Sequence, residues 1–381
     1  MELISGIIIG LIILLLLVVV HELGHAIVAH RNGVVIEEFG VGFPPKVWKK
    51  KLKNGILLSL NWLPIGGFVK LKGEYDSARE KGDYGAASFW TKTKILLAGV
   101  LINWLVAACI LTILALVGLP KIMPNQFSIA SDTTETTSLV KIGTIVENSP
   151  ADQAGIRAGD QVVRFAGQEV PTTDGFINLA SGSKGKTVEV IYLRDGEEAS
   201  TKVKLRTDNS DGDGYFGASV GQSETIRATW SAPIVGIMTT GQFTIATFEG
   251  VGNLAIDFAR GLLLQFSPDQ SIRTQSNQDL QDVSDNVAGP IGILGVIFPQ
   301  ASQAGLVQLL FLTAIISLTL AVMNILPIPG LDGGRWLTMT IFRFIKQPLT
   351  KKREEIIQSI GFLILSVLII SITISDVGKL F

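Results

Sequence analysis

The sequence is poor in charge, cysteine and histidine. Only 17% of its 381 residues are charged and 47% are hydrophobic, a balance too apolar for a soluble enzyme of this length. The single cysteine, Cys109, excludes a disulfide framework. The formal net charge of −1 gives no reason to expect a nucleic-acid partner. The only histidines are His21, His25 and His30, which limits the composition of any histidine metal site.

Long stretches lack charge almost entirely. A helix needs about 20 apolar residues to cross the hydrocarbon of a bilayer. Four segments meet this requirement: residues 3–27, 95–119, about 303–325, and 356–375. The first starts Met-Glu and lacks a small-residue cleavage site, so we expect a retained span and not a signal peptide. The predicted fold class is therefore a polytopic α-helical protein of the lipid bilayer with about four transmembrane helices.

The distribution of charge predicts how these spans are oriented. Residues 27–94 carry twelve Lys/Arg against six acidic residues, and residues 333–355 carry six against two. Residues 121–300 carry thirteen against twenty-one. Because basic loops stay in the cytoplasm, we expect both termini and residues 121–300 to be extracytoplasmic.

The first span ends in the motif His21-Glu22-Leu23-Gly24-His25. Histidines four residues apart share one face of a helix, and the intervening glutamate completes the H-E-x-x-H pattern of zinc hydrolases. Such enzymes hold zinc with three protein ligands and use the glutamate as a general base toward water. A set of buried polar residues bonded across helices is the alternative. Three ionisable groups within five residues of an apolar helix favour the metal site.

The third ligand must be a carboxylate or Cys109, because His30 falls on the opposite side of the helix. Asp332 is the best candidate, since it follows forty-six uncharged residues and an aspartate near membrane depth is costly. Pro327 and Pro329 break the helix ahead of it. The alternative is that the third span ends at Pro327 and Asp332 caps the next segment in solvent. The histidine motif upstream favours the ligand role.

Two segments between the spans have their own character. Residues 55–69 are uncharged but interrupted by Asn61, Pro64 and two glycines, so we expect extended chain turning back on itself and re-entering the membrane. An ordinary surface hairpin is the alternative. Residues 139–207 alternate short β-rich runs with turns. The part from 147 to 167, ENSPADQAGIRAGDQVVRFAG, resembles a PDZ domain of bacterial membrane and periplasmic proteases.

The predicted domain organisation follows from these segments. Residues 1–120 and 301–381 form the two halves of a membrane core, residues 139–207 form the PDZ-like α/β domain, and residues 208–300 form an amphipathic linker region. Within the linker, residues 229–265 are expected to be amphipathic helices on the membrane surface, with a fifth span as the alternative. Residues 267–285 are polar and predicted to be a loop.

The motifs taken together resemble the site-2 protease family, and most closely its bacterial regulator-of-sigma-E branch. The resemblance rests on HELGH, the PDZ-like stretch, GPIGI, and the run NILPIPGLDGG that ends at residue 334. It implies Zn²⁺ held by His21, His25 and Asp332, with Glu22 as catalytic acid/base. It also implies that Asn324 and Pro327 contact the substrate backbone.

This resemblance implies a metalloprotease that works inside the membrane. Its expected partners are pre-trimmed single-span membrane proteins, such as anti-sigma factors or signal-peptide remnants, cleaved toward the cytoplasmic side. A single PDZ-like segment is found where well-known members of the branch carry two. The alternative is a PDZ adaptor without proteolytic activity, in which the metal site is structural or inactive. Structural zinc sites usually have four protein ligands, and only three can be named here.

Overall fold

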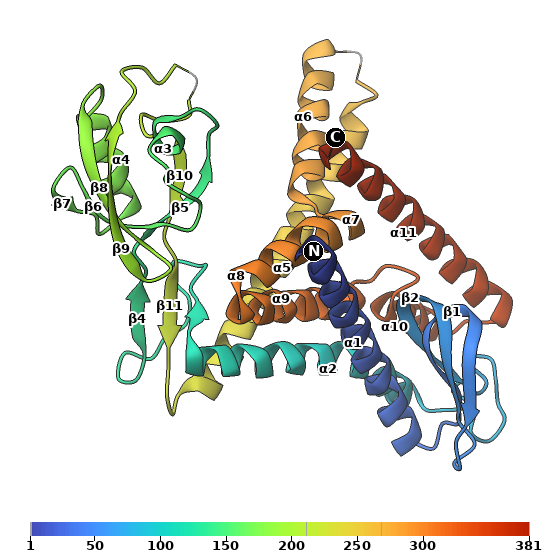
Figure 1. Cartoon of the computed structure of the whole chain (residues 1–381). Coiled ribbons are helices and arrows are strands. Elements are labelled where there is room, and N and C mark those ends of the chain that lie inside the picture. The colour runs from blue at the N-terminus through green and yellow to red at the C-terminus, as the bar shows by residue number, and fades with distance from the viewer. Residues whose placement is uncertain (1, 211, 268, 381) are drawn as a thin grey trace. The chain divides into compact units, whose positions relative to one another are not determined.

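The computed structural model describes residues 2–210, 212–267 and 269–380. The chain folds as two compact units, coloured by residue number in Figure 1. The first combines Met1–Val117 with Trp230–Phe381, and the second is Gly118–Thr229. The membrane-type helices and the HELGH motif belong to the first unit, and the PDZ-like stretch belongs to the second.

Among the described residues, four helices are long and apolar enough to cross a membrane, which confirms the predicted spans. They are α1(Glu2–Arg31), α2(Phe89–Val117), α9(Leu306–Ile325) and α11(Lys351–Leu380). Helices α2 and α11 begin several residues before the uncharged runs, because their polar first turns continue the backbone hydrogen bonding beyond the apolar segment. The chain is thus a multi-pass membrane protein.

Helix α2 is the centre of the first unit and packs against α1, α9 and α5(Ala232–Leu264). Polar contacts between side chains and neighbouring helices join this largely apolar bundle. The Ser317 hydroxyl donates to the Asn103 carbonyl at 2.9 Å, and the Trp104 indole donates to the Thr244 hydroxyl at 3.1 Å. Polar side chains that bond across helices in this way stabilise membrane bundles.

Between residues 229 and 300 the structure corrects the predicted linker. Residues 229–265 contain a single long helix, α5, instead of several, and it packs on α2 and α9. The polar segment after it is not a loop but the helix α6(Gln270–Asn286), which runs back along α5 (Figure 1). Its N-cap Asp269 accepts from the Ser271 N–H at 2.8 Å, and Ser276 donates to the Gly261 carbonyl at 2.6 Å. Local capping and tertiary packing therefore outweigh the polar composition.

The approach to α9 is helical as well. It consists of α7(Pro290–Gly292), the π-helical turn η1(Ile293–Ile297) and α8(Phe298–Ala304). The carboxylate of Asp376, near the end of α11, accepts from the N–H groups of Gly289 and Gly292 at 3.1 and 2.7 Å. This carboxylate occupies the place of an N-cap for α7 and ties the last span to this segment.

The segment 55–69 is extended, as predicted, but it pairs with the chain before it. The strands β1(Ile36–Lys51) and β2(Leu57–Leu71) form an antiparallel sheet. The register is interrupted, so that residues 38–41 pair with both 57–60 and 67–70. Buried Glu38 fixes this sheet from inside, accepting from Ser59 at 2.6 Å and forming an ion pair with Lys46 at 2.7 Å.

The second unit contains two sheets. One has the strand order β10(Ala218–Gly221), β5(Val140–Ile145), β6(Gln161–Phe165), β8(Thr187–Arg194), β9(Glu197–Lys204), with β7(Gln168–Glu169) beside β6. Its core includes the rings of Phe165, Phe176 and Phe216 in edge-to-face contact. The helices are α3(Pro150–Gln153) and α4(Thr173–Gly182). The compact unit is wider than residues 139–207, because β10 adds to the free side of β5.

The other sheet joins the ends of this unit. It has the order β3(Leu119–Pro120), β11(Glu224–Arg227), β4(Thr134–Thr137). The strand by which the chain enters the unit is thus hydrogen-bonded to the strand by which it leaves.

Candidate metal centre

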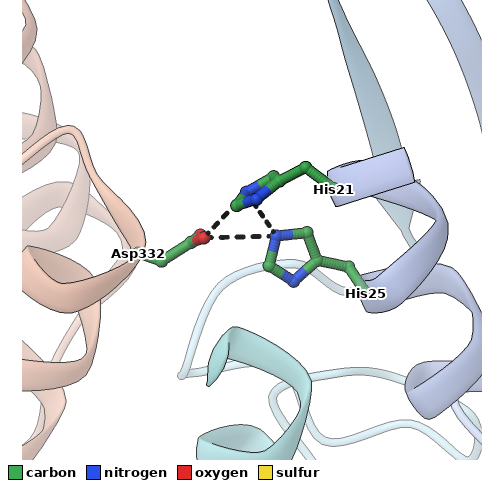
Figure 2. A group of neighbouring side chains, drawn as sticks. All are labelled: His21, His25 and Asp332. Carbon is green, nitrogen blue, oxygen red and sulfur yellow. Dashed lines mark hydrogen bonds and ion pairs between the residues drawn. The ribbon is translucent and has the colours of Figure 1, made fainter. Parts of the chain in front are cut away.

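The two histidines of the HELGH motif lie on one face of α1 and point toward the same place (Figure 2). Both are buried, with exposures of 7% for His21 and 8% for His25. Their Nε2 atoms are 3.1 Å apart. The four-residue spacing therefore brings the two ring nitrogens together as the sequence predicts.

Asp332 reaches this site from the other end of the chain. Helix α9 ends at Ile325, and the segment that follows, with Pro327 and Pro329, is not helical. Helix α10(Asp332–Phe344) then begins with the aspartate itself. Its Oδ2 lies 3.1 Å from His21 Nε2 and 3.2 Å from His25 Nε2. In the described part of the chain, these three residues form the one cluster of His, Cys and acidic groups with metal-binding geometry.

The two glycines after Asp332 make this approach possible. A Cβ atom on Gly333 would lie 2.1 Å from the Ile325 carbonyl oxygen, and one on Gly334 would lie 1.9 Å from that of Ile328. Both distances are shorter than any van der Waals contact, so residues with side chains would push α10 away from the end of α9. The LDGG sequence thus serves to fold the chain tightly enough to place Asp332.

The donor atoms fit a zinc ion. Four ligands at zinc bond lengths of about 2.0–2.1 Å in a tetrahedron lie roughly 3.3–3.4 Å apart, close to the separations seen here. His25 Nδ1 lies 2.7 Å from the Ile95 carbonyl oxygen and donates its proton there, which leaves the Nε2 lone pair directed at the cluster. Two imidazoles and one carboxylate are a common donor set of catalytic zinc. A zinc ion held by these three side chains would have one position left for a water or a substrate atom.

Two small residues that sequence reasoning missed allow α1 and α2 to meet beneath the histidines. A Cβ on Gly99 would lie 2.4 Å from His25 Nε2 and 2.6 Å from His21 Cε1. A Cβ on Gly24, inside the motif, would lie 2.6 Å from the Ala98 carbonyl oxygen. Close helix contacts at small residues are typical of membrane bundles. Gly24 is part of the HELGH motif and could have been noticed in the sequence. Nothing in the sequence shows that Gly99 lies against the same part of α1.

Glu22 lies next to the cluster and against the β-sheet. It is partly buried, and its carboxylate accepts a hydrogen bond from the backbone N–H of Val69 in β2. At Gly67 of the same strand, an added Cβ would lie 3.6 Å from Glu22 Cγ. The carboxylate is outside the set of metal ligands but beside it. A group so placed can exchange protons with a water or substrate at the centre.

The remaining predicted residues are outside this cluster. Asn324 lies in the last turn of α9, and Pro327 lies in the segment between α9 and α10 that leads to Asp332. The Asn324 side-chain amide donates to the Leu320 carbonyl at 2.9 Å, and Pro327 is exposed. His30 is exposed and outside the cluster, as predicted from the helix period, and Cys109 is also outside it.

Comparison with known proteins extends over nearly the whole chain. The model of peptidase family M50 matches residues 9–368. A protein of Clostridium perfringens is 30% identical over 368 residues, covering 95% of both chains. The regulator of sigma-W protease RasP of Bacillus subtilis is 23% identical over 450 aligned residues, covering 96% of each. The zinc metalloprotease RasP of Bacillus licheniformis is 24% identical, covering 96% of this chain and 97% of its own length.

Among solved structures, the PDZ domain of an SdrC-like protein from Listeria monocytogenes matches with 22% sequence identity and a TM-score of 0.21. The match covers 22% of this chain and 90% of that domain.

Proposed function

Because the chain belongs to peptidase family M50 and is a membrane-embedded zinc metalloprotease, as its motifs predicted, we propose that it cleaves pre-trimmed single-span membrane proteins within or near their transmembrane segments. The observation that carries this proposal is the cluster of His21, His25 and Asp332. Two of its members lie on a helix apolar enough to span a bilayer, so the reaction centre belongs at membrane depth.

In this proposal His21, His25 and Asp332 hold the zinc ion, and Glu22 is the general acid/base. A bound zinc ion would act as a Lewis acid, which lowers the pKa of a water molecule bound to it and polarises the scissile carbonyl. The Glu22 carboxylate takes a proton from the attacking water and delivers it to the leaving amide nitrogen. The hydrogen bond from the Val69 N–H keeps this carboxylate between the metal site and β2.

The substrate must unwind before it is cut, because a helical backbone engages its own carbonyls. The sheet formed by β1 and β2 offers backbone groups to which an unwound segment can add as a further strand. Its contact with Glu22 would bring such a strand close to the catalytic carboxylate. Asn324 and Pro327, on the chain leading to Asp332, are proposed to contact the substrate backbone from the other side.

The proposed orientation follows from charge. The basic loops before α2 and α11 support an orientation with the active site toward the cytoplasm and the PDZ-like unit on the outer side of the inner membrane. This side receives the external stump of a substrate already shortened by another protease. A bulky unit there would exclude substrates with large external domains. Anti-sigma factors and signal-peptide remnants are proteins of the expected kind.

A peptidase assay with metal analysis tests this function. The purified chain should cleave a single-span substrate with a short external stump, and each of His21→Ala, His25→Ala and Asp332→Ala should lose most of its zinc. Glu22→Gln should retain zinc and lose cleavage. Equal cleavage by wild type and Glu22→Gln would refute the acid/base assignment, and zinc binding without any cleavage by wild type would favour the non-proteolytic adaptor.

A further inference from the structure

We propose that Arg335 and Glu354 are positioning residues that hold Asp332 at the metal centre. This inference rests on the proposed function, since it assigns to the two residues an effect on zinc affinity. Arg335 follows Asp332 by three residues, on the next turn of α10. Glu354 lies in the first turn of α11 and is only 2% exposed.

The pair is built so that each oxygen of Glu354 accepts from a different donor. Oε1 accepts from Arg335 Nε at 3.2 Å and lies 3.1 Å from Arg335 Nη2. Oε2 accepts from the backbone N–H of Asp76 at 2.9 Å. Because both neighbours are donors, a glutamine here would turn its NH₂ group toward one of them and lose that contact.

Arg335 is held from other directions too. Its Nη2 donates to the Glu74 carbonyl, and its Nη1 lies 3.6 Å from the Glu74 carboxylate. The guanidinium lies 4.7 Å from the centre of the ring of Tyr84, which is fully buried. A planar cation stacked on a ring and bonded along its edge has little freedom to move, and α10 moves with it.

The start of α10 is not continuous with α9, because the segment 326–331 separates the two helices, and contacts from other elements add to its packing against that segment. Helix α11 contacts this start at two points one turn apart. Glu354 binds Arg335, and four residues later the Gln358 Oε1 accepts from the Gly330 N–H at 2.7 Å. These contacts bracket Asp332, with one on each side of it in the sequence.

The same network reaches the other parts of the site. The Asp76 carboxylate pairs with Lys92, which is buried in the first turn of α2. One turn further along, α2 provides the Ile95 carbonyl that orients His25. The loop with Glu74 and Asp76 continues β2, whose Val69 N–H contacts Glu22. The ion pair thus fastens α10, α2 and β2 relative to one another.

Zinc affinity of the full-length protein, measured by chelator competition, tests this role. Glu354→Gln should bind zinc at least about tenfold more weakly than wild type, the lower end of the range for groups that support metal ligands. The control is Glu80→Gln, which removes an exposed ion pair with Lys72 in the same loop and should leave the affinity unchanged. Wild-type affinity in Glu354→Gln would overturn the proposal.

A second variant and a second readout separate positioning from folding. If Glu354→Gln is aggregated, Arg335→Lys replaces it, because lysine keeps the charge but loses the planar fork. This variant should also bind zinc more weakly, and unchanged affinity would overturn the proposal. Excess zinc should restore peptidase activity to a folded variant whose ligand is merely displaced, and failure to recover once zinc is bound would count against positioning. If wild type binds zinc but cleaves nothing, the proposed function fails while the affinity comparison still decides this inference.

Discussion

Replacing Gly99 by alanine should weaken zinc binding much more than it lowers the stability of the zinc-free protein. The added Cβ would lie 2.4 Å from His25 Nε2 and 2.6 Å from His21 Cε1. Ordinary carbon contacts begin at about 3.5 Å, so the methyl group overlaps the imidazoles by about 1 Å. Helices α1 and α2 must then separate or the rings must rotate, and His25 loses its alignment with the Ile95 carbonyl.

The size of the effect follows from the overlap. Inserting a methyl group into a well-packed site typically costs about 1–3 kcal/mol. If most of that cost falls on the metal-binding geometry, zinc affinity drops by about tenfold to a hundredfold, since each 1.4 kcal/mol is a factor of ten. Alanine is also a better helix former than glycine by roughly 1 kcal/mol, which works in favour of the helix. Zinc affinity should therefore fall much further than the stability of the zinc-free protein.

Chelator competition and thermal unfolding of the zinc-free protein measure the two quantities. Gly250→Ala in α5 is the matched control, because a Cβ there has no neighbouring atom within 4 Å among the described residues. It should leave zinc affinity unchanged. Wild-type zinc affinity in Gly99→Ala would refute the steric account, and an equal loss of affinity in both variants would point to a general effect of alanine.

Three further predictions concern the rest of the chain. Cysteines placed at Lys50 and Lys352 should be protected from membrane-impermeant thiol reagents in intact cells, whereas one at Ser183 should react; the reverse pattern would invert the orientation. Burial alone would raise the pKa of Asp160, but its hydrogen bonds and ion pair with Arg194 lower that pKa. The carboxylate therefore stabilises the PDZ-like unit at neutral pH, and in denaturant titrations its advantage over Asp160→Asn should shrink as the pH falls below about 4. An advantage that stays constant as the pH is lowered from about 7 to about 2 would contradict this. Replacing the PDZ-like unit by a flexible linker should permit cleavage of untrimmed substrates with zinc still bound, and loss of cleavage of trimmed ones would favour peptide capture over exclusion.

Local rules were sufficient to predict part of the centre. Helical periodicity placed His21 and His25 on one face and His30 on another. Asp332 was identified because a charge after a long uncharged stretch needs a reason, and the structure brings it to the histidines. The spans followed from length and hydropathy, since the bilayer sets both.

What could not be predicted depends on distant partners. Gly99 is one of many small residues in an apolar helix, and its role appears only where α1 crosses α2. The segment 267–285 has the composition of a loop, and it is helical because it packs along α5. The pairing of Glu38 with two separate parts of β2 also cannot be predicted from the sequence around Glu38, because the residues of one strand do not specify which strand pairs with it. The pairing of Arg335 with Glu354 is likewise set by the fold, because the two residues lie on different helices.

Because β3 pairs with β11, the second unit is inserted between α2 and α5 through two adjacent strands. Thr225 lies opposite Pro120 and Ile226 opposite Leu119, so the chain enters and leaves at neighbouring points. A domain inserted through adjacent ends can be lengthened, exchanged or duplicated while the two flanking helices keep their spacing. The second unit can thus change without a change in the helices that carry the zinc ligands. Chimeras joined at these two strands would test whether the unit determines which substrates are cleaved.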